Sequence, residues 1–105
     1  MEIRPDELAQ KLRSGEPVYL LDVRHEWEHQ LVRLQDQAHI PLHELPARLE
    51  EVQPKSALVV AYCHHGVRSL SAAALLRQAG FDNAVSLAGG IDLWSRLIDQ
   101  SVPRY

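Results

Sequence analysis

The only cysteine of the chain, Cys63, lies in a stretch whose residue types suit chemistry on a sulfur atom. His64, His65 and Gly66 follow it directly, and Arg68 stands five positions after it. Glycine can adopt the positive φ angle of a tight loop, and arginine offers a forked cation that binds anions. The spacing C-x-x-G-x-R therefore indicates a cysteine held in an anion-binding loop.

The segments around this loop predict where it lies. Residues 57–62 form an apolar run of strand length, and residues 69–79 are rich in alanine and leucine, which predicts a buried helix. Amides that lead into a helix have no intrahelical partners, so they can converge on a negative group such as a thiolate. A lone cysteine after an apolar strand can also be a small core residue. The glycine and the arginine at this spacing favour the nucleophile.

The rest of the chain alternates between strand and helix patterns. Further strands are predicted at 18–22 and 84–87, and further helices at 6–14, around Leu45, Leu49 and Val52, and over 91–98. Continuous apolar strands between helices are typical of a parallel sheet covered on both faces. The predicted fold class is α/β, in a single domain over residues 1–105. In such sheets ligands bind beyond the carboxyl ends of the strands, where Cys63 is expected.

Three motifs resemble the rhodanese family in both order and spacing. They are residues 21–24 (LDVR), residues 63–69 (CHHGVRS) and residues 87–94 (LAGGIDLW). The resemblance covers nearly the whole chain and implies the rhodanese-like fold, a central parallel β-sheet flanked by helices on both faces. It also implies a sulfurtransferase that needs no cofactor.

The resemblance implies a mechanism and a set of site residues. Cys63 would take a sulfane sulfur from thiosulfate or a low-molecular-weight persulfide, carry it as a persulfide, and pass it to cyanide or a thiol. Catalysis would rest on Cys63 and Arg68. The loop that binds the donor would comprise His64, His65, Gly66, Val67 and Ser69, and the polar side chains Asp22 and Arg24 would support it from the neighbouring strand.

The length of the loop favours sulfur over phosphate. Related phosphatases place five residues between the cysteine and the arginine, whereas this chain has four, residues 64–67. The shorter loop fits a sulfane sulfur better than a tetrahedral oxyanion. Phosphatase and arsenate reductase activities are therefore disfavoured.

Two other functions stay open at this point. The chain could be a sulfur-relay carrier whose donor and acceptor are proteins, with weak thiosulfate activity. It could also be a non-enzymatic rhodanese-like binding module, although the loss of the loop cysteine is the usual mark of that class. The presence of Cys63 ranks this last alternative below the others.

Composition narrows the choice of partners and location. The net charge is -3 and the basic residues are scattered, so neither nucleic acid nor a membrane is expected as a partner. A single cysteine forms no intrachain disulfide, and residues 1–7 do not resemble a signal peptide. These features predict a cytoplasmic protein.

The six histidines raise the question of a metal site. His25 and His29 lie four apart, as do His39 and His43, but structural zinc normally has four ligands and often paired cysteines. We therefore expect no metal, and we expect His64 and His65 to be partly charged donors at the rim of the pocket. Residues 30–38 and 103–105 have no predicted conformation.

Overall fold

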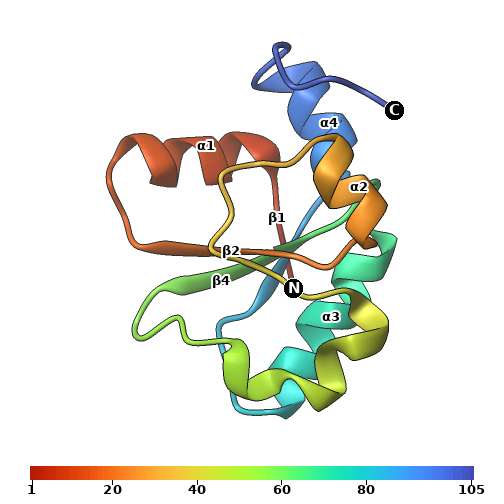
Figure 1. Cartoon of the computed structure of the whole chain (residues 1–105). Helices are drawn as coiled ribbons and strands as arrows, with labels where there is room; N and C mark the ends of the chain where they lie inside the picture. Colours follow the sequence, from red (N-terminus) through yellow and green to blue (C-terminus); the bar gives the residue numbers. More distant parts are fainter.

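The computed structural model describes residues 1–105, and a five-stranded sheet forms its centre (Figure 1). The strands lie in the order β1-β5-β4-β2-β3, and every neighbouring pair is parallel. Their bounds are β1 Glu2–Ile3, β2 Val18–Asp22, β3 Ala38–His39, β4 Leu58–Tyr62 and β5 Val85–Leu87. The strands predicted at 18–22, 57–62 and 84–87 are the three central ones.

Helices cover both faces of the sheet. In Figure 1, α1 (Pro5–Arg13) and α4 (Gly90–Leu97) lie above it, and α3 (Val67–Gln78) lies below it with two 3-10 helices. These are η1 (Leu42–Ala47) and η2 (Leu49–Glu51), and α2 (Glu26–Leu31) follows the carboxyl end of β2. The predicted α/β class with a parallel sheet and helices on both faces is confirmed.

Alternation along β4 divides its side chains between two hydrophobic clusters. Val59, Ala61 and Cys63 point into the cluster that α3 covers, with Ala72 and Leu76 of that helix. Val60 and Tyr62 join the opposite cluster, which includes Trp94 of α4. Both faces of β4 are buried, which matches its apolar sequence. The packed strand holds Cys63 in a fixed position at its carboxyl end.

The helix expected around Leu45, Leu49 and Val52 is replaced by η1 and η2. Pro46 lies inside η1 and has no amide hydrogen, so an α-helix cannot continue through it. Arg48 then leaves the helical region and separates the two turns. Leu45 and Val52 still reach the core. The apolar spacing therefore identified buried positions, but the predicted type of helix is wrong.

The segment without a predicted conformation runs along the edge of the sheet. After α2 ends, the Gln37 backbone amide donates a hydrogen bond to the Leu20 carbonyl at 2.9 Å. The Gln37 side-chain oxygen accepts a hydrogen bond from the Leu20 amide at 2.6 Å. The chain then enters β3 beside β2.

None of the helices is both long enough and apolar enough to cross a membrane. The cytoplasmic location stays a prediction.

Candidate active site

Cys63 lies at the carboxyl end of β4, and donors from the next turn surround its sulfur. The amides of Gly66 and Ser69 donate to Sγ at 3.1 and 3.3 Å, and the Ser69 hydroxyl oxygen lies 3.4 Å from it. Ser69 Oγ is itself 2.7 Å from Ser86 Oγ on β5. The sulfur thus sits in a pocket of donors that suits a negative charge.

Gly66 allows the loop to turn tightly beneath the neighbouring chain. Its φ angle is +98°, which side chains other than hydrogen rarely permit. A Cβ at this position would lie 3.0 Å from the Gly89 amide nitrogen. The predicted role of this glycine therefore has two causes, the backbone angle and a close approach to residue 89.

The third sequence motif holds the loop from the other side. The amide of Ile91 donates to the Cys63 carbonyl at 2.9 Å, and that of Asp92 donates to the His64 carbonyl at 3.1 Å. Both amides belong to the first turn of α4, where they have no intrahelical acceptor. The motif at residues 87–94 thus serves the cysteine loop directly, although it is far from it in sequence.

The two loop histidines form a stack at the surface of the site. Their ring centroids are 3.9 Å apart, and the Tyr105 ring stacks on the other face of His64, also at 3.9 Å. Burial lowers the pKa of His64, with a further contribution from the charge of His65. His64 is therefore less charged than expected, whereas His65 is exposed with Nε2 4.0 Å from Asp92 Oδ2. Val67, the other predicted loop residue, is 77% exposed.

Arg68 binds a carboxylate that the sequence analysis did not select. Its Nη1 and Nη2 atoms donate to Glu28 Oε1 and Oε2 at 2.7 and 2.9 Å. Glu28 lies on α2 and is only 3% exposed. Burial by itself would raise the pKa of Glu28, but the hydrogen bonds from Arg68 and Tyr105 outweigh it and lower the pKa to about 2. The pair is therefore ionised and fixes the start of α3 against α2.

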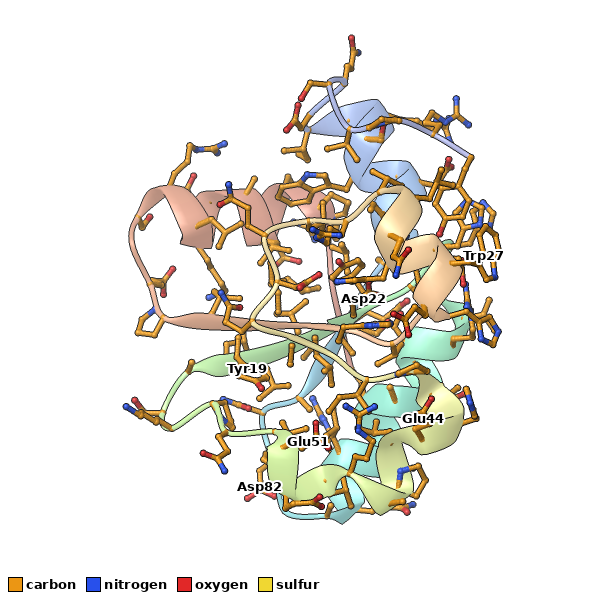
Figure 2. All side chains as sticks on the ribbon, in the orientation of Figure 1. Tyr19, Asp22, Trp27, Glu44, Glu51 and Asp82 are labelled. Atoms are coloured by element: carbon orange, nitrogen blue, oxygen red, sulfur yellow. The ribbon has the colours of Figure 1, made fainter.

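Asp22 and Arg24 are fully buried and bind each other rather than the loop. Arg24 donates from Nε to Asp22 Oδ1 at 2.9 Å and from Nη2 to Oδ2 at 2.8 Å. Arg24 Nη1 reaches the Tyr105 hydroxyl at 2.9 Å, and that hydroxyl donates to Glu28 at 2.8 Å. The two residues therefore connect to Arg68 through Tyr105 and Glu28. Figure 2 shows Asp22 inside the molecule and Trp27 of α2 at its edge.

The histidines pair differently from their spacing in sequence. His29 stacks on His39, with centroids 4.1 Å apart, and His25 lies near His43. Asp22 joins the first pair, because its Oδ2 lies 2.8 Å from His29 Nδ1. Both Asp22 oxygens already accept hydrogen bonds from Arg24, and His39 Nε2 is bound to the Arg24 carbonyl. The expectation that no metal binds stays a prediction.

Sequence reasoning missed three residues that complete this arrangement, namely Glu28, Ser86 and Tyr105. Glu28 had a usable signal, since it lies a helical turn after the LDVR motif and carries a charge opposite to that of Arg68. Ser86 was hidden in a short apolar strand, and nothing local distinguished Tyr105. All three are brought to the loop by packing across the sheet.

Comparison with known proteins places this geometry in a family. Residues 4–97 match the family model of the rhodanese-like domain. A protein of Allochromatium vinosum named sulfurtransferase is 39% identical over 95 residues, which is 90% of this chain and 88% of that protein. The structure of a human single-domain sulfurtransferase, TSTD1, superposes with a TM-score of 0.76 at 28% identity, covering 91% of this chain and 96% of the other.

A longer relative shares only part of its length with this chain. The Ogataea parapolymorpha protein named adenylyltransferase and sulfurtransferase uba4 is 32% identical over 97 residues. The match covers 92% of this chain but 25% of uba4. The region that carries the cysteine loop therefore resembles both a short sulfurtransferase and one part of a larger enzyme.

Proposed function

The chain belongs to the rhodanese-like domain family and is a sulfurtransferase, and we propose that it carries sulfur as a persulfide on Cys63. The observation that carries this proposal is the pair of amides, of Gly66 and Ser69, that donate to Sγ, with the Ser69 hydroxyl oxygen 3.4 Å away. They stabilise a thiolate before the reaction and an anionic terminal sulfur after it.

The first half of the reaction loads the cysteine. The Cys63 thiolate attacks the outer sulfur of thiosulfate, a new sulfur–sulfur bond forms, and the old bond breaks with its electron pair leaving on sulfite. With a low-molecular-weight persulfide as donor, the leaving group is the corresponding thiolate. Arg68 contributes positive charge beside the loop, and its pairing with Glu28 fixes the direction of that charge.

The second half restores the enzyme. Cyanide or a thiolate attacks the terminal sulfur of the persulfide, and the Cys63 thiolate leaves with the electron pair. The products are thiocyanate or the persulfide of the acceptor thiol, and no oxidant or reductant is consumed. The donor and the acceptor therefore react in turn at the same cysteine, which predicts ping-pong kinetics.

Intact mass measurement tests this proposal. After incubation with thiosulfate, or separately with glutathione persulfide, the protein should gain the mass of one sulfur atom, and cyanide or dithiothreitol should remove it. Cys63→Ser is a clean control, because the chain then contains no cysteine. A gain of mass in Cys63→Ser, or turnover by that variant, would exclude the persulfide on Cys63.

The match with uba4 favours a second candidate, in which the donor or the acceptor is a protein. The similar region there is one quarter of a larger protein whose name joins sulfur transfer to adenylyl transfer. A relay carrier of this kind would gain sulfur readily from a cysteine desulfurase and poorly from thiosulfate. The same mass measurement with the desulfurase and free cysteine as donor separates the two functions.

A further inference from the structure

The segment after α4 returns to the cysteine loop, although it lies outside the residues that match the family. The Val102 carbonyl accepts a hydrogen bond from the Ser95 hydroxyl on α4. Arg104 Nε donates to Asp92 Oδ1 at 2.9 Å, and Val102 and Tyr105 pack against the core cluster beneath α4. These contacts hold residues 102–105 along α4 and bring the Tyr105 side chain to the site.

Aromatic contacts fix the ring of Tyr105 on two sides. It stacks on His64, the residue after Cys63, with the ring planes inclined by only 7°. The Trp27 ring approaches it edge-on from α2, with centroids 6.0 Å apart. Stacked and edge-to-face pairs at these separations are favourable, so the ring has a defined orientation. The direction of its hydroxyl group is defined as well.

The hydroxyl group lies between the buried Asp22–Arg24 pair and the partly exposed Glu28–Arg68 pair. It accepts a hydrogen bond from Arg24 Nη1 at 2.9 Å and donates to Glu28 Oε2 at 2.8 Å. The same carboxylate oxygen accepts the Arg68 Nη2 hydrogen bond at 2.9 Å. Burial raises the pKa of Tyr105 to about 12, so its hydroxyl keeps its proton and continues to donate at neutral pH. Tyr105 therefore holds Glu28 Oε2, while the His25 amide holds Oε1 at 3.1 Å.

We propose that Tyr105 is a positioning residue, whose hydroxyl orients Glu28 and, through Glu28, aims the Arg68 guanidinium at anions that approach Cys63. The inference deepens the proposed function, because it identifies what sets the preference of the site for anionic donors. Its basis is geometric: both oxygens of Glu28 bind Arg68, and one of them also binds Tyr105. Without the Tyr105 bond, the carboxylate stays anchored at Oε1 by the His25 amide, but it can turn about that contact and carry the guanidinium away from the loop.

Alkylation of Cys63 tests this role without relying on sulfur transfer. Iodoacetate is an anion and iodoacetamide is neutral, so the ratio of their rate constants measures anion attraction at the same sulfur. Tyr105→Phe keeps the stacking ring and removes only the hydroxyl, so the variant is expected to fold, and its melting temperature checks this. We expect the iodoacetate to iodoacetamide ratio to fall about tenfold, the scale of one hydrogen bond to a charged group.

A matched control and a double-mutant cycle define the result. Tyr19→Phe removes another tyrosine hydroxyl, one that bonds only to the Glu51 carbonyl, and should leave the ratio unchanged. Because Tyr105 acts through Glu28, Tyr105→Phe should change the ratio little in a Glu28→Gln background. An unchanged ratio in Tyr105→Phe, or independent effects of the two substitutions, would overturn the proposal.

Kinetics with thiosulfate supply the readout that belongs to the reaction itself. Tyr105→Phe should raise KM for thiosulfate several-fold and change kcat less, because it weakens the attraction of the donor rather than the nucleophile. If the wild-type protein gains no persulfide while the alkylation ratio still falls in Tyr105→Phe, the positioning role stands and the proposed function fails. The two proposals are thus separated by different measurements.

Discussion

Arg68 is at once part of an ion pair and the cation nearest in sequence to Cys63. Its guanidinium is about one-third exposed, whereas its partner Glu28 is almost fully buried. From the sequence alone, the removal of a loop cation is expected to spare the fold. The Glu28 contact changes this expectation, because removing the cation leaves a buried carboxylate without a counter-charge.

The first residue-scale prediction concerns Arg68→Ala. We expect kcat/KM for thiosulfate to fall roughly 10- to 150-fold, since a charge-assisted hydrogen bond to an anion contributes about 1.5–3 kcal/mol. We also expect the free energy of unfolding to decrease by about 3 kcal/mol, the low end for a broken buried pair, because Arg68 is partly exposed. Steady-state kinetics and urea unfolding measure the two effects.

The double variant Arg68→Ala/Glu28→Gln separates these effects. Glutamine removes the stranded charge, so the free energy of unfolding should recover in part, while kcat/KM for thiosulfate stays low. Recovery of both quantities would show that Arg68 acts only through the stability of the loop. Unchanged thiosulfate kinetics in Arg68→Ala would remove it from the site altogether.

At the scale of elements, the site is a junction of three segments rather than one loop. The loop joins β4 to α3, while the first turn of α4 donates two amides to its carbonyl groups. Gly90 makes this approach possible. A Cβ there would lie 2.5 Å from the Cys63 carbonyl oxygen and still closer to that of His64.

The element-scale prediction is that Gly90→Ala separates α4 from the loop. The new methyl group must displace backbone atoms that hold Cys63, so sulfur transfer should fall by at least about 100-fold and stability by about 2–3 kcal/mol. Kinetics at saturating thiosulfate and urea unfolding measure the change. Wild-type activity in this variant would show that the junction does not set the geometry of the sulfur.

Gly15→Ala is the matched control for this substitution. Gly15 also has a positive φ angle, +74°, but no atom lies within 4 Å of a Cβ placed there. In this variant the free energy of unfolding should fall by only about 1–2 kcal/mol, the cost of a left-handed backbone conformation in alanine, and activity should be unchanged. The difference between the two variants then measures the packing contact alone.

At the scale of the whole molecule, buried charges connect distant parts of the chain. The chain of contacts runs from Asp22 through Arg24 and Tyr105 to Glu28 and Arg68. It ties β2, α2, the start of α3 and residues 102–105 together at one end of the sheet. Because hydrogen bonds from Arg24 and Arg68 hold its buried acids ionised, the network makes folding stability depend on pH.

The whole-molecule prediction is a loss of stability in acid that depends on Glu28. The pKa of Glu28 is about 2 in the folded protein against an ordinary value of 4.5. Its contribution, on the order of 3 kcal/mol, is therefore complete above about pH 4.5 and disappears as the pH falls towards 2. Asp22 acts in the same direction, since hydrogen bonds from Arg24 outweigh its burial and lower its pKa.

Urea unfolding of Glu28→Gln at several pH values tests this. The variant should be less stable than wild type at pH 7, and the two should converge between about pH 4.5 and 2. Asp36 has the opposite sign, because burial raises its pKa, but it is present in both proteins and cancels in the comparison. A difference in stability that stays constant down to pH 2 would contradict the prediction.

The sequence by itself determined the three central strands, the helices α1, α3 and α4, and the position of the cysteine loop. The apolar runs at 18–22, 57–62 and 84–87 correspond to the three central strands. They could be predicted because strand and helix patterns depend on residues close together in the chain. The C-x-x-G-x-R loop is also local, so its position between β4 and α3 followed from the sequence. Pro46 is an equally local signal, and it argues against an α-helix at this position. The prediction followed the apolar spacing instead and was wrong about the type of helix.

Only the tertiary structure decided which residues complete the site. Glu28 lies 40 residues from Arg68, and Tyr105 lies 77 residues from Glu28, so no spacing along the chain could join them. His29 likewise stacks on His39 and not on His25, four positions away. Parallel strands bring distant segments together at their carboxyl ends, and which side chains meet there depends on sheet order and register, which local patterns do not encode.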